Sequence, residues 1–159
     1  MAEALVLGFE CKVYFNDEVA DGGAGTIAVP VWLELDELAD ATLNIKFNEA
    51  DSATRGTNGI DTKEPGLLAI TVEGTVQWRA DNENISLMLA KCLGRDAWDL
   101  LILTGSRTDP LSKGVRGDFK ITSFPRKEAL GDVVTHDLVF TACNSFRANN
   151  VVASTGVAP

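Results

Sequence analysis

The side chains that could do chemistry are few and lie far apart in this sequence. The 159 residues include a single histidine, His136, and three cysteines, Cys11, Cys92 and Cys143. The cysteines are odd in number and lack the CxxC spacing of a zinc site or redox motif. We expect free thiols in a protein made in a reducing cytoplasm, with no disulfide framework, no bound metal and no cofactor.

His136 has no partner in sequence that would make a catalytic site. Hydrolysis and proton transfer need a nucleophile with a base, or two carboxylates in different environments. His136 shares the strand parity of Val134, Leu138 and Phe140, which places it on an apolar face. No serine lies in a GxSxG elbow, and no glycine pattern matches a phosphate-binding loop or dinucleotide fingerprint. We therefore predict that the chain is not an enzyme.

Composition and charge exclude further classes. The chain is 45% hydrophobic and 23% charged, as expected for one folded domain, and its formal net charge is −9. Nucleic-acid binding requires clustered Lys and Arg, and no such cluster occurs. The longest apolar run, WDLLIL at 98–103, is too short for a membrane span. The tripeptide Arg116–Gly117–Asp118 lies inside a strand pattern, so we interpret this potential adhesion signal as a chance occurrence.

Most of the sequence alternates with the period of two that is typical of half-buried antiparallel strands. Four such segments run through LNIKF, AITVEGTVQW, VRGDFKITSF and VVTHDLVFTA. Further strands are predicted around 5–15 and 27–35, where Pro30 favours an edge or bulge. The segment 97–105 is apolar on both faces, as a covered strand would be.

One helix is predicted in RADNENISLMLAKCLGRD. Asp81 or Asn82 can cap its start and Gly94 can end it, with an apolar face between them. The expected fold is mainly β, a β-sandwich or partly open β-barrel, with one α-helix packed on it. We predict a single domain over 1–143, with a long loop at 49–66, followed by a polar carboxyl-terminal tail at 144–159.

The loop EADSATRGTNGIDTKEPG is unusually long and polar for the middle of a compact domain. Asn58–Gly59 is a strong turn signal, so the segment could form a projecting hairpin. One interpretation is a mobile solvated loop; the other is an arm that folds on contact with a neighbouring subunit. The candidate contact residues are Glu49, Asp51, Arg55, Asn58, Asp61, Lys63 and Glu64.

The order of these features resembles the major tail tube protein of long-tailed bacteriophages. The segments on which this resemblance rests are, in chain order, ELDELADATLNI, the loop ATRGTNGIDTKEPGL, LAITVEGTVQW, the helix DNENISLMLAKCLG, SRTDPLSKGVRGDFKITSF and PRKEALGDVVTHDLVFTA. Together they cover roughly 30–142. The segment 97–104 matches only in hydrophobicity, and the carboxyl end lacks an added immunoglobulin-like domain.

The resemblance implies a structural virion protein in the phage tail, synthesised in the host cytoplasm. Such subunits form homo-hexameric rings that stack into a hollow tube, contact other tail proteins, and let viral DNA pass down the lumen during ejection. Inner tubes of contractile tails and of type VI secretion are similar in fold. A lining that repels DNA would carry carboxylates, and Glu73, Asp118 and Asp137 are the lumen-lining candidates, with Lys46 and Lys120 on the same faces.

Two other functions remain compatible with the sequence. The chain could be another virion component, such as a tail terminator or head decoration protein, or a small β-sandwich binding module. Carbohydrate-binding modules usually expose aromatic side chains, whereas Trp32, Trp78 and Trp98 all lie on apolar or covered strands.

Overall fold

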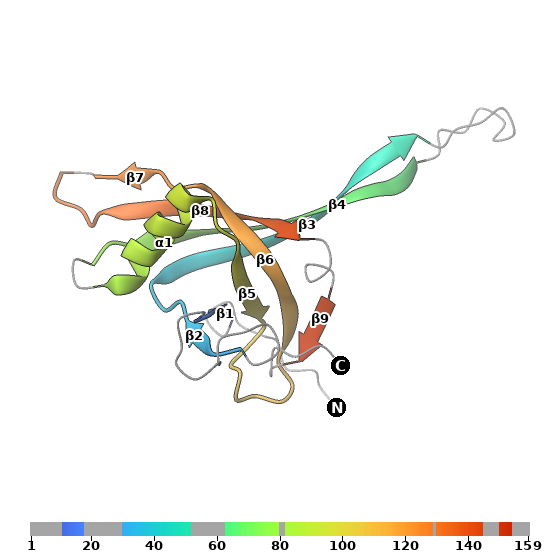
Figure 1. Cartoon of the computed structure of the whole chain (residues 1–159), viewed down its shortest axis with the longest axis horizontal. Helices are drawn as coiled ribbons and strands as arrows, with labels where there is room; N and C mark the ends of the chain where they lie inside the picture. Colours follow the sequence, from blue (N-terminus) through green and yellow to red (C-terminus); the bar gives the residue numbers. More distant parts are fainter. Residues whose placement is uncertain are drawn as a thin grey trace, which may run out of the picture.

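A computed structural model of the chain describes its central sheet, its helix and most connections (Figure 1). The described residues are 11–17, 30–51, 63–79, 82–128, 130–144 and 150–153, of which 50, 51, 64, 144 and 150–153 are described by their backbone only. They form β1 (Lys12–Asn16), β2 (Trp32–Glu34), β3 (Leu38–Asp51), β4 (Lys63–Gln77), α1 (Glu83–Gly94), β5 (Trp98–Leu103), β6 (Lys113–Ser123), β7 (Arg126–Lys127), β8 (Thr135–Asn144) and β9 (Asn150–Ala153).

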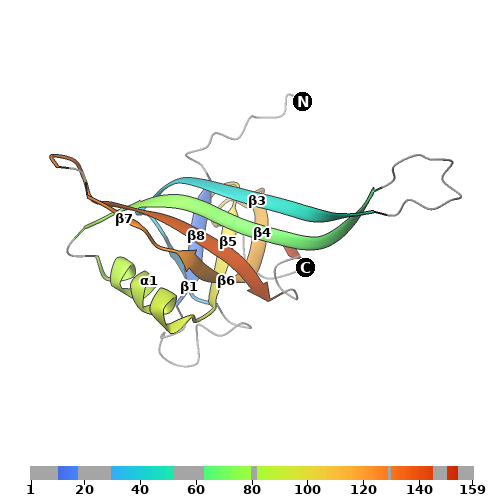
Figure 2. The same ribbon diagram turned by 90° about the horizontal axis from the view of Figure 1, so that it is seen from above.

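All of these strands join one antiparallel sheet. Its path is β2-β1-β5-β6-β8-β4-β3, while β7 pairs with β8 and β9 pairs with β6. Figure 2 shows β3, β4 and β8 running along the molecule, whereas β1, β5 and β6 run across it. The prediction of a mainly β fold with one helix is confirmed, and its form is a single curled sheet.

The core lies on the concave side of the curled sheet. Alternation with period two supplies its side chains from β1, β4, β5, β6 and β8, and α1 closes it with Ile85 and Met88. The largest fully buried side chains include Trp98, whose ring centroid lies 4.7 Å from that of Phe15. Every residue of β5 is buried, which confirms the prediction of a covered strand at this position.

The helix begins as the sequence predicts and ends one residue later. Asn82 is the N-cap, and its side-chain oxygen accepts the Asn84 backbone N–H at 2.7 Å. Gly94 is the last helical residue rather than the residue that ends the helix. Arg95 takes the left-handed conformation at φ 59° instead, and its N–H reaches the Cys92 carbonyl at 3.2 Å.

A buried ion pair lies on the convex face of β5 and β6. Arg116 donates to both carboxylate oxygens of Asp99, through Nε at 3.0 Å and a terminal nitrogen at 2.6 Å. Asn16 donates to the same carboxylate at 3.3 Å, and the guanidinium lies 5.0 Å from the ring of Trp32. Arg116 is therefore fixed in strand β6 and buried, so the RGD tripeptide is not displayed as a loop ligand.

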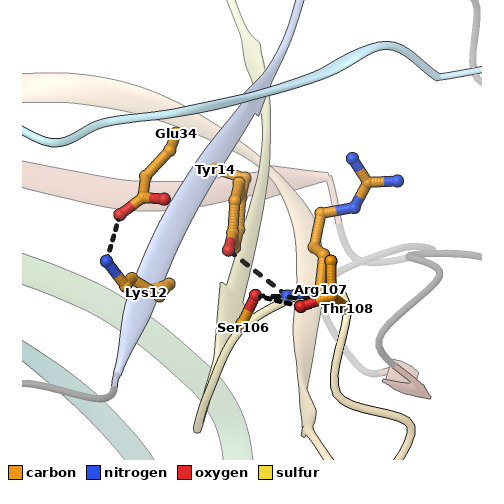
Figure 3. A network of polar contacts seen from close by, with 6 residues as sticks. All are labelled: Lys12, Tyr14, Glu34, Ser106, Arg107 and Thr108. Atoms are coloured by element: carbon orange, nitrogen blue, oxygen red, sulfur yellow. Dashed lines mark hydrogen bonds and ion pairs between the residues drawn. The ribbon is translucent and has the colours of Figure 1, made fainter.

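The β5–β6 connection is held against strand β1. Figure 3 shows the Tyr14 hydroxyl accepting the backbone N–H of Arg107 at 3.3 Å. Ser106 and Thr108 bond each other through their hydroxyls at 2.9 Å within the same turn. The middle of this connection is thus anchored to β1, while Leu111, two residues before β6, is 82% exposed.

Strand β3 forms one edge of the sheet and contains an irregularity near its start. Its register with β4 shifts between Ala39 and Thr42, and Asp40 has a φ of 51°. Positive φ is uncommon for residues other than glycine, although aspartate tolerates it better than most. From Thr42 onward the pairing with β4 is regular as far as Phe47.

The terminal regions differ from the sequence prediction. The strand predicted at 5–15 is β1, Lys12–Asn16, and the strand predicted at 27–35 is the short β2; residues 1–10 and 18–29 lie outside the described residues. In the region predicted to be a polar tail, residues 150–153 form β9 and pair with β6. The two valines of this segment favour a strand, and backbone pairing with β6 completes it.

Candidate assembly surfaces

A continuous polar surface covers the face of β6, β8, β4 and β3 opposite the core. Asn44 pairs with Thr71, and Thr71 pairs with Thr141, so these side chains lie side by side across three strands. Thr122 of β6 bonds the Thr141 hydroxyl at 3.0 Å. We call this surface the polar sheet face.

Two of the three predicted lumen carboxylates lie on the polar sheet face. Glu73 is exposed and accepts a hydrogen bond from Asn44 at 3.3 Å. Asp137 bonds Thr75 at 2.9 Å and forms an ion pair with Lys127. The Lys127 ammonium, with help from the Thr75 hydroxyl, lowers the pKa of Asp137 below its usual value.

Asp118, the third predicted lumen carboxylate, does not lie on the polar sheet face. It is only 5% exposed and pairs with Asp99 in the β5–β6 ladder, on the face that carries the buried ion pair. Its prediction as a residue of an open polar face was wrong, because the half of β6 that pairs with β5 is covered on both sides. Periodicity places Asp118 opposite Phe119 but does not indicate what covers either face.

The described part of the polar sheet face has no excess of negative charge. Lys46 and Lys120 are exposed on it, and Lys127 reaches Asp137 from β7. Against these three cations stand the carboxylates of Glu73 and Asp137. The surface is instead dominated by uncharged threonine and asparagine side chains. The chain's net charge of −9 is therefore carried mainly elsewhere.

The predicted loop is shorter than expected because the flanking strands extend into it. Strand β3 runs to Asp51 and pairs there with Lys63, the first residue of β4. Figures 1 and 2 show this hairpin projecting beyond the rest of the molecule. Glu49 and Lys63 form an ion pair across it at 3.0 Å. We call residues 45–51 and 63–68 the arm.

The other predicted contact residues cannot be placed as side chains. Asp51 and Glu64 are described by their backbone only, within the paired part of the arm. Arg55, Asn58 and Asp61 lie outside the described residues. Their role in subunit contacts stays a prediction.

The arm exposes apolar side chains that the sequence places against a core. Ile45 is 51% exposed, Phe47 is 55% exposed and Leu67 is 79% exposed. The alternation correctly separates Ile45 and Phe47 from the polar sheet face. It does not show that this part of the hairpin extends past the chain's own core. The arm therefore presents apolar surface that this chain leaves uncovered.

His136 is buried, as predicted, on the core side of β8. It is 3% exposed, and its ring lies 4.6 Å from Phe124 and 5.5 Å from Trp78 between centroids. Burial lowers the pKa of His136, and the nearby Arg126 guanidinium lowers it further. The Pro125 carbonyl and Glu128 act in the opposite direction.

The fold is expected to lose stability as the pH falls below the ordinary histidine pKa of 6.5. The unfolded chain takes up the proton before the folded chain does, so the stability is fully present above that pH and is lost as the pH falls toward the folded-state pKa. One proton contributes at most about 1.4 kcal/mol for each pH unit. Melting temperatures between pH 7.5 and pH 5 measure this loss, and His136→Phe should reduce it. An equal loss in the variant would assign the effect to carboxylates.

The described residues offer no metal centre and no membrane-crossing helix. No group of three His, Cys, Asp or Glu side chains among them could hold a metal ion. The helix found in this part of the chain is neither long enough nor apolar enough to span a bilayer.

The fold of the chain, but not its sequence, matches known proteins. No family model and no curated protein sequence matches the chain. The fold matches a chain of the SPP1 tail tube with a TM-score of 0.67 at 13% identity, covering 88% of this chain and 77% of that chain. It also matches the tail of an empty gene transfer agent particle with C6 symmetry, at a TM-score of 0.62 and 12% identity, covering 92% and 97%.

The chain has the tail tube fold.

A third match is to a chain of a baseplate. A chain of the six-fold symmetrised anti-feeding prophage baseplate aligns over 91% of this chain and 95% of that chain, with a TM-score of 0.59 and 8% identity. The resemblance that the sequence suggested is thereby confirmed for the fold. The solved structures named here that share the fold come from two tails and a baseplate.

Sequence reasoning missed the buried pair of Asp99 and Arg116. One signal was present, since Asp99 is the only charged residue in the apolar segment WDLLIL. A charge inside a covered strand needs a buried partner. The identity of that partner depends on the pairing of β5 with β6, which the sequence alone does not reveal.

Proposed function

We propose that this chain is a structural subunit of a phage-like tail, made in the host cytoplasm and assembled into the virion. Copies form homo-hexameric rings that stack into a hollow tube through which DNA is delivered. The observation that supports this most directly is the tail tube fold combined with an arm whose apolar side chains, Ile45 and Phe47, are uncovered in the single chain.

Ring formation would complete the open edge of the sheet. Strand β3 ends the sheet path, so one side of its backbone has no strand partner within the described chain. Exposed edges are aggregation hazards unless they are paired or covered. Pairing with the next copy is a head-to-tail contact, and such contacts produce closed rings when the rotation is right. Six copies fit the C6 symmetry of the gene transfer agent tail that shares this fold.

The polar sheet face would line the lumen. Threonine and asparagine side chains cover most of it, while its few charges include Glu73 and Asp137 with lysines nearby. A dense cationic lining would bind phosphates and retain DNA. A mixed, mostly neutral surface would let DNA pass without specific binding.

Electron microscopy of the concentrated purified protein tests this proposal. Stacked rings or tubes with a central channel are the expected result. Isolated rings that never stack would instead favour a terminator-like virion component. Particles that stay monodisperse monomers at every concentration would contradict the proposal and favour a binding module.

Deletion of residues 52–62 is expected to leave a folded subunit that no longer forms tubes. The reason is that the deletion removes the connection beyond the paired end of the arm, which ends at Asp51 and Lys63. Circular dichroism checks the fold and negative-stain microscopy counts tubes. A variant in which the same segment is replaced by glycine and serine separates loop length from loop sequence. Tubes of normal length in both variants would exclude a stacking role.

A further inference from the structure

The apolar stripe of α1 is covered at one end and uncovered at the other. Ile85, Leu89 and Leu93 follow each other at intervals of four and so lie along one side of the helix. Ile85 is 1% exposed, Leu89 is 40% exposed and Leu93 is 75% exposed. The core continues along α1 through Met88 and Cys92, and Leu89 and Leu93 lie on the flank of the helix that it leaves uncovered. We call Leu89 and Leu93 the helix ridge.

The helix ridge lies beside a stretch of strand edge for which no strand partner is described. Helix α1 packs on the core side of β6, and the Cys92 thiol donates to the Ile121 carbonyl at 3.9 Å. The pairing of β6 with β5 stops at Phe119, which faces Trp98. Beyond it, the strand partners described for Lys120–Ser123 all come from β8. On the other edge of this stretch no strand partner is described, and the Cys92 thiol of α1 reaches the Ile121 carbonyl there.

A β3 strand from a second copy has side chains arranged to fit this place. Within its own sheet, β3 presents Ile45 and Phe47 on the core side and Lys46 on the polar sheet face. A strand that continues the sheet at the β6 edge keeps the same two sides. Ile45 and Phe47 would then lie on the side where α1 lies, and Lys46 would lie beside Lys120 and Thr122.

We propose that the helix ridge, Leu89 and Leu93, is the acceptor surface for Ile45 and Phe47 of the arm of a second copy. This inference rests on the proposed function and identifies which surfaces meet when subunits associate. Figures 1 and 2 place the arm and α1 toward opposite ends of the molecule, so the contact is head-to-tail. Burial of four large apolar side chains provides the driving force.

A mixing experiment with two variants tests the contact. Phe47→Glu damages the arm but leaves the helix ridge intact, and Leu93→Glu does the reverse. Each variant alone should remain a folded monomer under conditions where the wild-type protein forms rings or tubes. An equimolar mixture should give heterodimers and nothing larger, because only one undamaged contact can form. Light scattering after size exclusion measures the masses, and thermal melting checks the fold.

Leu111→Glu is the matched control, since Leu111 is 82% exposed on the β5–β6 connection away from both surfaces. It should assemble as the wild type does. Assembly of Leu93→Glu at the wild-type level, or a mixture that yields no heterodimer, overturns the proposed contact while the tube function stands. Leu93→Ser replaces Leu93→Glu if the latter melts early. A wild-type protein that never assembles overturns both proposals.

Discussion

Replacement of Asp99 by alanine is expected to lower the free energy of unfolding by about 3–5 kcal/mol, the usual cost of removing one partner from a buried ion pair. The side chains of Asp99 and Arg116 are 3% and 8% exposed. Without the carboxylate, the buried guanidinium beside Trp32 loses the two hydrogen bonds that Asp99 accepts from it, and Asn16 loses the one that it donates to Asp99. Urea unfolding followed by circular dichroism measures the change.

The exposed ion pair of the arm is the control for this prediction. Glu49 and Lys63 are 69% and 47% exposed, and pairs of this kind contribute about 0–1 kcal/mol. Glu49→Ala should therefore have little effect. The double variant Asp99→Leu with Arg116→Met should recover part of the loss, because it removes both charges of the pair together. A small effect of Asp99→Ala would show that water reaches the guanidinium in solution.

Replacement of Trp98 by alanine is expected to cost about 3–5 kcal/mol as well, because it opens a cavity in the centre of the core. Trp98 is 1% exposed, begins β5, and packs against Phe15 of β1 at 4.7 Å between ring centroids. Trp98 thus packs β5 against β1. Both strands contribute side chains to the core, and Asp99 of the buried ion pair lies on β5. Chemical denaturation measures the loss, and Trp98→Phe should recover part of it.

The control for Trp98→Ala is Leu111→Ala on the exposed β5–β6 connection. Surface substitutions of this kind usually change stability by less than about 0.5 kcal/mol. A cost for Trp98→Ala that is close to this value would mean that the sheet repacks around the missing ring. It would contradict the close packing of β1 on β5.

Local sequence patterns predicted the individual strands and the helix more accurately than they predicted which strands pair. The alternation through Val72 and Val76, the covered segment at Leu100, and the helix cap at Asn82 are all confirmed. Each depends on neighbours within a few residues. The helix end was misplaced by one residue because Arg95 adopts a conformation usually taken by glycine.

The errors share one physical cause, which is long-range pairing. Asp118 was placed on an open face because the sequence does not reveal that it pairs with Asp99. Ile45 and Phe47 were expected against a core because alternation indicates a face but not what covers it. Strand β9 was missed because its pairing depends on β6, which is distant in sequence.

The backbone irregularity at Asp40 affects how accurately a second strand could align with the edge of β3. A slip of one residue along β3 would turn every side chain of an incoming strand to the opposite surface. The positive φ of Asp40 and the shifted register between Ala39 and Thr42 interrupt the regular row of amides and carbonyls. A second strand that paired with β3 in a shifted register would not match the hydrogen-bonding groups at this irregularity. We therefore expect the irregularity to favour one pairing register over the adjacent ones.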